Sequence, residues 1–251
     1  MLRRLHPDPG EQELHELYAG LTLPEGSRRH RSWVALCMVA SVDGAVAVDG
    51  LSEGLGGEAD LLALSRLRAS NDVSLVGAGT VRTERYRPLT GSARRREDRA
   101  GRGLRSAPRL AIVTRSARLD PQLPVFDDPD ERPLLLTCER ADPAALARLG
   151  DRAEVHVLGE DTVVIERALD HLADLGLPRV LCEGGPSLNQ TVLAADRVDE
   201  VFLTLAPALV GGPATRIVHG DREVPHDLTL VSVFESEGDL LLRYQHRDHH
   251  R

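Results

Sequence analysis

The sequence contains no lysine, and all 31 of its basic residues are arginine. This excludes a Schiff-base lysine and the lysine of a Walker-type phosphate-binding loop. Positive charge is also in deficit, because 39 acidic residues against 31 arginines give a formal net charge of −8. A general nucleic-acid binder needs a basic field, so we expect no nucleic-acid partner. Any anionic ligand must instead be held by a few local groups.

Cysteines are few and far apart. Cys37, Cys138 and Cys182 each lie inside an apolar run, and there is no CxxC motif. This excludes a zinc ribbon and a thioredoxin-like pair, and it favours buried free thiols in a reducing compartment. We therefore expect a cytoplasmic protein without a metal.

Long apolar runs are missing as well. The longest, such as 33–40, are far shorter than the roughly 18 residues of a membrane-spanning helix. The arginines at positions 3 and 4 have no apolar stretch behind them, so the start does not read as a secretory signal. We expect no membrane partner.

Strand and helix patterns alternate through the middle of the chain, and strands alone finish it. Strands are expected at 33–41, 73–76, 110–114, 134–138, 154–158, 179–183, 201–205, 228–234 and 240–245. Helices are expected at 58–69, from 143 onward, at 165–175 and at 186–195. This order predicts an α/β fold with a mostly parallel central sheet, flanking helices and an antiparallel C-terminal strand pair. The last two strands are apolar enough to need covering, which favours a dimer.

Three segments are expected to lie outside this pattern. Residues 1–31 are polar and punctuated by proline and glycine, which predicts an N-terminal arm before one domain over 32–247, and 248–251 form a tail. Segment 91–107 contains six arginines and no aromatic residue, which is typical of a mobile, solvated loop. An arginine flap over an anionic ligand stays open as the alternative.

Two glycine turns carry the strongest signals. An apolar strand runs into Gly184-Gly185 with a helix expected from Pro186, an arrangement that exposes backbone N–H groups to an anion. Residues 76–84 repeat the pattern, although Arg82 replaces the third glycine of a dinucleotide fingerprint. Two such turns predict one extended ligand across the edge of the sheet.

Two further strand ends are polar. Thr114, Arg115 and Ser116 combine hydroxyls with a guanidinium, which suits a phosphate monoester, although a solvated strand end explains them equally well. The first strand ends in ASVDG, where Asp43-Gly44 alone would indicate a turn.

Together these motifs resemble a known family. ASVDG, a Gly-rich segment with a helix ending in LRA, VGAGTVRTE, VTRS and CEGGPSL follow one another over roughly 33–245, as in the pyrimidine reductases of riboflavin biosynthesis. The resemblance implies a dihydrofolate-reductase-like fold, a homodimer, NADPH as cofactor, and reduction of the ribosylamino group of a pyrimidine 5′-phosphate to ribitylamino. The deaminase zinc signature is missing, so the chain would be a stand-alone reductase acting on either the deaminated or the undeaminated pyrimidine.

The resemblance also assigns residues. On the cofactor it implies Val39, Gly79, Thr80, Glu84, Thr114, Arg115, Ser116, Gly184, Gly185, Pro186, Ser187 and Leu188. On the substrate it implies Ser52, Arg68, Arg87 and Glu183, with Arg68 suited to the 5′-phosphate. Asp43 and Glu183 are the candidate catalytic carboxylates, and the sequence does not decide which donates a proton. Cys37 stands where two-domain relatives carry lysine.

Two alternatives remain. One is a dihydrofolate-reductase-like paralogue acting on a pterin, and the other is a non-catalytic NADPH-binding dimeric protein. Ser52 and Arg68 favour a phosphorylated sugar over the pterin.

Overall fold

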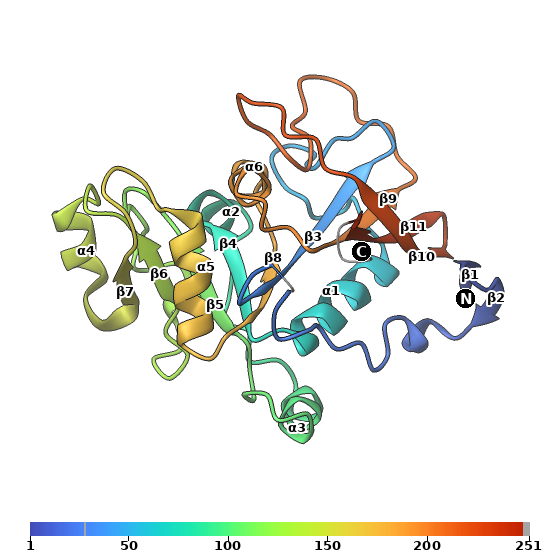
Figure 1. The fold of residues 1–251 in the computed structure, drawn as a ribbon, viewed down its shortest axis with the longest axis horizontal. Helices are drawn as coiled ribbons and strands as arrows, with labels where there is room; N and C mark the ends of the chain where they lie inside the picture. Colours follow the sequence, from blue (N-terminus) through green and yellow to red (C-terminus); the bar gives the residue numbers. More distant parts are fainter. Residues whose placement is uncertain (28, 248–251) are drawn as a thin grey trace.

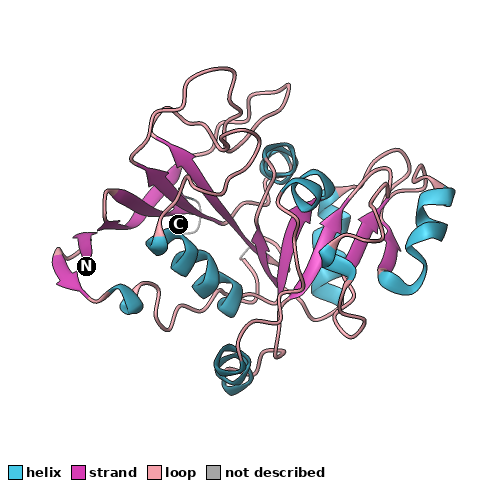
Figure 2. Ribbon diagram, turned by 180° about the vertical axis from the view of Figure 1, so that it is seen from behind, coloured by secondary structure: helices cyan, strands magenta, loops and turns pink. Residues whose placement is uncertain are grey.

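The computed structural model describes residues 1–27 and 29–247 and contains one large sheet flanked by helices (Figures 1 and 2). Its strands are β1 (Leu2–His6), β2 (Gly10–Gln12), β3 (Trp33–Ser41), β4 (Val73–Gly77), β5 (Arg109–Val113), β6 (Leu134–Thr137), β7 (Glu154–Val157), β8 (Arg179–Cys182), β9 (Glu200–Ala206), β10 (Leu228–Ser236) and β11 (Asp239–His246). Its α-helices are α1 (Glu58–Ser70), α2 (Ala78–Thr83), α3 (Ala93–Gly101), α4 (Pro143–Leu149), α5 (Ile165–Asp174) and α6 (Pro186–Ala194). No helix in the described part of the chain has the length and apolarity needed to cross a membrane.

The sheet has eleven strands in the order β2-β1-β10-β11-β9-β3-β8-β4-β5-β6-β7. The strands from β9 to β7 are parallel, and β11, β10, β1 and β2 complete the sheet in antiparallel fashion. The parallel strands are apolar on both faces because helices cover both of them: α5 and α6 pack on one face, and α1 and α4 on the other. The predicted mostly parallel α/β fold with an antiparallel C-terminal pair is confirmed.

The N-terminal residues, predicted to form an arm, add two strands to the sheet and contribute to the core. β1 pairs with β10, with Arg3 opposite Glu235, and Leu2, Leu17 and Leu23 are buried. The reason is that β10 would otherwise present an unpaired edge. Because the chain covers this edge itself, the exposed-edge argument for a dimer no longer applies, and the homodimer stays a prediction from the resemblance alone.

Segment 91–107 is not the expected solvated loop. It contains α3, capped by the Ser92 side chain, which accepts from the N–H of Arg95. Arg99 is fully buried, and its guanidinium donates to the carbonyl oxygens of Arg68 (2.9 Å), Asn71 (2.8 Å) and Arg105 (2.9 Å). The segment therefore supports the end of α1, and none of its residues lines the cleft described below. The predicted tail, 248–251, lies outside the described residues.

Candidate functional site

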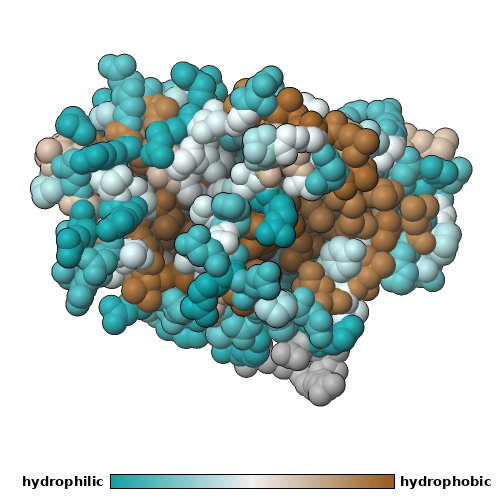
Figure 3. Space-filling view, turned by 90° about the horizontal axis from the view of Figure 1, so that it is seen from above, coloured by the Kyte–Doolittle hydropathy of each residue, from teal (hydrophilic) through white to brown (hydrophobic). Residues whose placement is uncertain are grey.

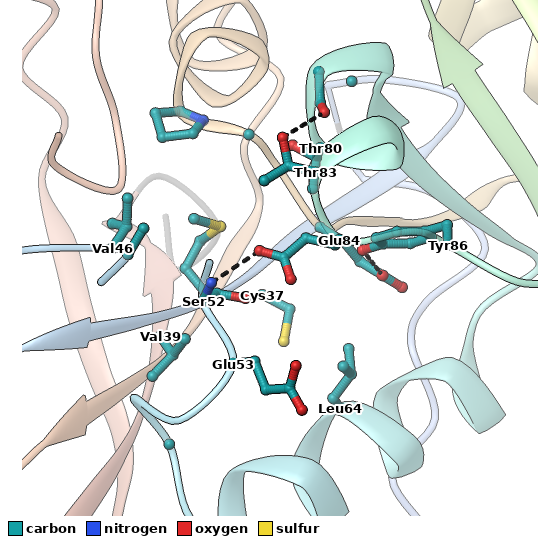
Figure 4. A pocket seen from close by; sticks show the side chains of 18 of the residues that line it. Cys37, Val39, Val46, Ser52, Glu53, Leu64, Thr80, Thr83, Glu84 and Tyr86 are labelled. Atoms are coloured by element: carbon teal, nitrogen blue, oxygen red, sulfur yellow. Dashed lines mark hydrogen bonds between the residues drawn. The ribbon is translucent and has the colours of Figure 1, made fainter. Parts of the chain in front are cut away.

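A cleft of about 720 Å³ opens where the carboxyl ends of β8 and β4 meet β3. Figure 3 looks onto the molecule from above, where apolar side chains gather in the middle with hydrophilic ones around them. Many of the predicted cofactor and substrate residues line the cleft, and Figure 4 shows several of them. They are Val39, Ser52, Gly79, Thr80, Glu84, Glu183, Gly185, Pro186, Ser187 and Leu188. The backbone N–H of Ser52 donates to Glu84 Oε1 (2.9 Å), which ties the 49–55 loop to α2 across the cleft.

The two glycine turns form one structure. The backbone N–H of Gly77, at the end of β4, donates to the carbonyl oxygen of Gly184 (2.7 Å). A Cβ on Gly185 would lie 2.8 Å from Thr80 Oγ1, and one on Gly184, whose φ is +85°, would lie 3.0 Å from Met38 Sδ. A side chain at Gly184 would be strained and one at Gly185 would displace the Thr80 side chain, so glycine leaves the backbone exposed to the cleft where α6 begins.

Glu183 lies in a buried network at the end of β8. Its carboxylate accepts from Arg68 Nε (2.9 Å) and Nη2 (2.5 Å) and from the Tyr86 hydroxyl (2.7 Å), and its side chain is 3% exposed. Burial alone would raise the pKa of Glu183, but Arg68, Tyr86 and Ser74 together hold it below its usual value. The ionised form of Glu183 is therefore favoured, and it occupies one edge of the Arg68 guanidinium.

Asp43, the other predicted catalytic carboxylate, is exposed and does not line the cleft. Its carboxylate accepts from the Ser41 hydroxyl (2.5 Å) and from the backbone N–H groups of Gly211 (2.6 Å) and Val210. These hydrogen bonds lower the pKa of Asp43 to about 2. The arrangement fastens the loop after β9 to the end of β3, which is a structural role.

Asp60 is a carboxyl that the sequence did not single out. It lies in the first turn of α1 and lines the cleft. Burial raises the pKa of this carboxyl, a hydrogen bond with Thr204 lowers it in part, and the charge of Asp239 raises it further. An acid in a first helical turn is expected from the helix dipole alone, so no sequence signal separated Asp60 from an ordinary surface acid.

The cleft is acidic. Its charged lining residues among those described are Glu53, Asp60, Glu84 and Glu183, and none is basic. Cys37 also lines it, and burial raises the pKa of this thiol well above its ordinary value, so it stays neutral. An anionic ligand here must be held by backbone N–H groups and hydroxyls, or by arginines at the rim.

The remaining predicted residues lie outside the lining, and Arg68 is among them, although it contacts the lining residue Glu183. Thr114, Arg115 and Ser116 follow β5, the strand beside β4. The Thr114 hydroxyl accepts from the N–H of Ala117 (3.1 Å), and Arg115 Nε donates to the carbonyl oxygen of Asp161 (2.9 Å). Arg87 is exposed. The structure thus brings the glycine turns, Ser52, Glu84 and Glu183 together but leaves Arg87 and the three residues after β5 beyond the cleft.

Comparison with known proteins gives a consistent result. Residues 32–242 match the family model described as the RibD C-terminal domain. The chain is 33% identical over 193 residues to the 2,5-diamino-6-ribosylamino-4(3H)-pyrimidinone 5′-phosphate reductase of Methanothermobacter thermautotrophicus, covering 76% of this chain and 85% of that protein. The reductase of the same name from Archaeoglobus fulgidus is 30% identical, with 72% and 83% covered.

Longer relatives match over part of their length. The chain is 28% identical to RibD of Mycobacterium tuberculosis over 211 residues, which is 83% of this chain but 49% of that protein. Among solved structures, a pyrimidine reductase-like protein from Corynebacterium diphtheriae superposes with a TM-score of 0.79 at 26% identity, covering 93% of this chain and 98% of that one. The resemblance predicted from the motifs is confirmed, and the chain belongs to the RibD C-terminal domain family.

Proposed function

We propose that this chain is an NADPH-dependent reductase that converts the ribosylamino group of a pyrimidine 5′-phosphate into a ribitylamino group. The observation that carries the proposal is the pair of joined glycine turns beside the buried Glu183–Arg68–Tyr86 network. The archaeal relatives are named for the 2,5-diamino pyrimidinone, so we favour the undeaminated substrate.

The cofactor fits the glycine turns chemically. Gly79, Thr80, Gly185 and Ser187 would hold the pyrophosphate through backbone N–H groups and the Thr80 hydroxyl, a mode that suits a lining without basic residues. Pro186, which has no N–H, and Leu188 would contact the cofactor without donating to it. Thr114, Arg115 and Ser116 lie one strand further along the same edge and would receive the 2′-phosphate. When bound, NADPH supplies a hydride.

The substrate would lie on the other side of the cleft. Arg68 donates from Nε and Nη2 to Glu183, and Nη1 would be the nitrogen that it offers to a phosphate or sugar oxygen. Ser52 offers its hydroxyl from the facing loop. Arg68 would thus orient substrate and neutralise Glu183 at the same time.

The reduction also needs a proton at the substrate nitrogen. Glu183 is held ionised and Asp43 lies away from the cleft, so neither suits the role of donor. Asp60 lines the cleft and pairs with no guanidinium of the described residues, and its raised pKa favours the protonated form that a general acid requires. We assign the proton to Asp60.

The test is turnover by the purified chain. NADPH oxidation is followed with 2,5-diamino-6-ribosylamino-4(3H)-pyrimidinone 5′-phosphate, with its deaminated uracil counterpart and with dihydrofolate, and the product is identified by mass. We expect a ribitylamino product from the diamino substrate. Turnover of dihydrofolate alone supports the pterin alternative, and NADPH binding without turnover of any substrate supports the non-catalytic one. Sedimentation tests the predicted homodimer.

A further inference from the structure

A second cavity, of about 440 Å³, lies apart from the cleft, and none of the described residues lines both. Asp196, His226 and His246 line it together with Arg29 and Asp227. Asp196 follows α6, His226 precedes β10 and His246 ends β11. Three elements distant in sequence therefore converge on this cavity with ligand-type side chains.

The three side chains are close enough to share one ion. Asp196 Oδ1 lies 3.0 Å from His226 Nε2 and 3.9 Å from His246 Nε2, and all three candidate ligand atoms lie within 4.8 Å of one another. Ligands at the 2.0–2.1 Å bonds of tetrahedral zinc are roughly 3.4 Å apart. Small side-chain movements would bring these atoms to that spacing.

The surroundings of His226 point to a cation. Its Nδ1 lies 3.2 Å from the carbonyl oxygen of Val224, and its Nε2 faces the carboxylate of Asp196. Both ring nitrogens thus face acceptors, whereas a neutral imidazole has one N–H to donate. Two arrangements satisfy both acceptors: a protonated imidazole that donates at both nitrogens, or a metal ion at Nε2 with the Nδ1–H donated to the carbonyl oxygen, as metal-bound histidines characteristically do.

Asp196 is fixed in a way that suits a ligand. Arg29 Nη1 donates to Oδ2 (2.7 Å), so Oδ1 is left to face the two imidazoles. The backbone of Asp196 has a φ of 56°, and its carbonyl oxygen lies 3.1 Å from His30 Nε2. The histidines are well covered, with side-chain exposures of 14% for His226 and 8% for His246. The nearby Arg29 and Arg247 charges oppose a cation, so we expect moderate affinity.

We propose that Asp196, His226 and His246 form a binding site for a divalent transition-metal ion, with Zn²⁺ as the best fit. Two imidazoles and one carboxylate are a ligand set that zinc accepts, and water completes the tetrahedron. The ion would join the end of α6, the segment before β10 and the end of β11. Its role is stabilisation of the fold, separate from the reductase cleft.

The test uses the full chain after chelator treatment. The sequence also contains His249 and His250, which lie outside the described residues, so all titrations are made in a His249→Ala/His250→Ala background. We expect one Zn²⁺ per chain with a dissociation constant of micromolar order, a higher Tm on binding, and Co²⁺ absorption of the tetrahedral type. Affinity should fall as the pH drops from about 7.5 to about 5.5, because the imidazoles must lose their protons to bind.

Variants identify the ligands. His226→Ala and Asp196→Asn should each weaken Zn²⁺ binding at least tenfold, and His226→Gln provides a polar replacement should the alanine variant not fold. His15→Ala, which removes an exposed histidine elsewhere, should bind as the parent does. The proposal is overturned by absence of saturable Zn²⁺ binding, by parental affinity in folded His226 variants, or by displacement of Zn²⁺ with equimolar Mg²⁺, which prefers oxygen ligands.

Discussion

Glu183 and Asp196 each have an arginine partner, but the surroundings of the two carboxylates differ. Glu183 is buried, and Arg68 and the Tyr86 hydroxyl hold it by hydrogen bonds. Asp196 has a side chain that is 53% exposed, and two of its neighbours are the imidazoles of His226 and His246. Burial leaves the ionised Glu183 dependent on its protein partners, whereas exposure lets solvent or an ion replace the partners of Asp196. The first arrangement suits a fixed feature of a cleft, and the second suits a site that gains or loses a cation.

The largest effect is expected when Arg68, the partner of the buried Glu183, is removed. Arg68→Ala leaves the Glu183 carboxylate buried without a counter-charge, which should lower the free energy of unfolding by about 3–5 kcal/mol in a urea titration. Activity should fall with it, and Arg68→Lys should recover only part, because an ammonium cannot reproduce the planar fork.

The matched control is Arg31→Ala. Arg31 pairs with Asp174 at 2.6 Å, but both side chains are more than half exposed, so its loss should cost at most about 1 kcal/mol. Equal destabilisation by the two alanine variants would contradict the role given to burial.

Asp60 extends the comparison to a carboxyl that, among residues 1–27 and 29–247, has no guanidinium as an ion-pair partner. As the proposed proton donor it acts in its protonated form, so kcat of the parent should fall as the pH rises through its raised pKa. Asp60→Asn should reduce kcat by about 10²–10³-fold with NADPH affinity unchanged. Measurement of kcat against pH checks this, and an Asn variant that keeps the parental basic limb would rule out Asp60.

Arg115 contrasts with Arg68, since within the described part of the chain its guanidinium donates to the backbone carbonyl of Asp161 and pairs with no carboxylate. A guanidinium without an acid partner is available to a ligand phosphate. Arg115→Ala should therefore weaken NADPH about tenfold and leave NADH unchanged, as followed by fluorescence titration. Arg118→Ala, in the same turn but paired with Asp142, serves as the control. Equal affinity of the parent for both cofactors would refute the assignment.

The smallest effect is expected at Asp196 in metal-free protein. Arg29 and His226 lower the pKa of this carboxyl against the effect of burial. Its contribution to stability is therefore present above the unfolded pKa of about 4 and is lost as the pH falls through the lower folded value. Because the side chain is half-exposed, Asp196→Asn should cost at most about 1 kcal/mol at neutral pH in a urea titration. A loss as large as that of Arg68→Ala would place Asp196 with the buried carboxylates.

Most of the sheet was predictable because its strands and helices carry strong local patterns. The apolar run of β3, the apolar stripe of α5 and the Asp142 cap of α4 agree with the structure within one or two residues. The prediction that failed, a solvated loop at 91–107, concerns residues whose hydrogen-bond partners lie far away in the sequence. Arg99 is buried because the carbonyl groups of Arg68 and Asn71, at the end of α1, accept its hydrogen bonds. The composition of segment 91–107 does not indicate these hydrogen bonds.

The same distinction applies to the cleft. The glycine turns were predictable because their strain and close approach require glycine. The catalytic role of Asp43 stays a prediction, because a motif gives order along the chain but not the direction of a side chain, and this carboxylate accepts from the N–H of Gly211. Asp60 and Tyr86 were missed because each is brought to the cleft by packing alone.

The pairing of β1 with β10 has a consequence for how the chain is made. Arg3 and its partner Glu235 are 232 residues apart, so β1 leaves the ribosome long before the strand that will accept its hydrogen bonds. Contacts of such high sequence separation form late, because they carry the entropy of closing a long loop. β2 can pair with one edge of β1 at once, but during synthesis the other edge must wait unpaired until β10 has been made. Until β10 has been made, the backbone N–H and C=O groups on that edge of β1 can pair with a chaperone or with a neighbouring nascent chain.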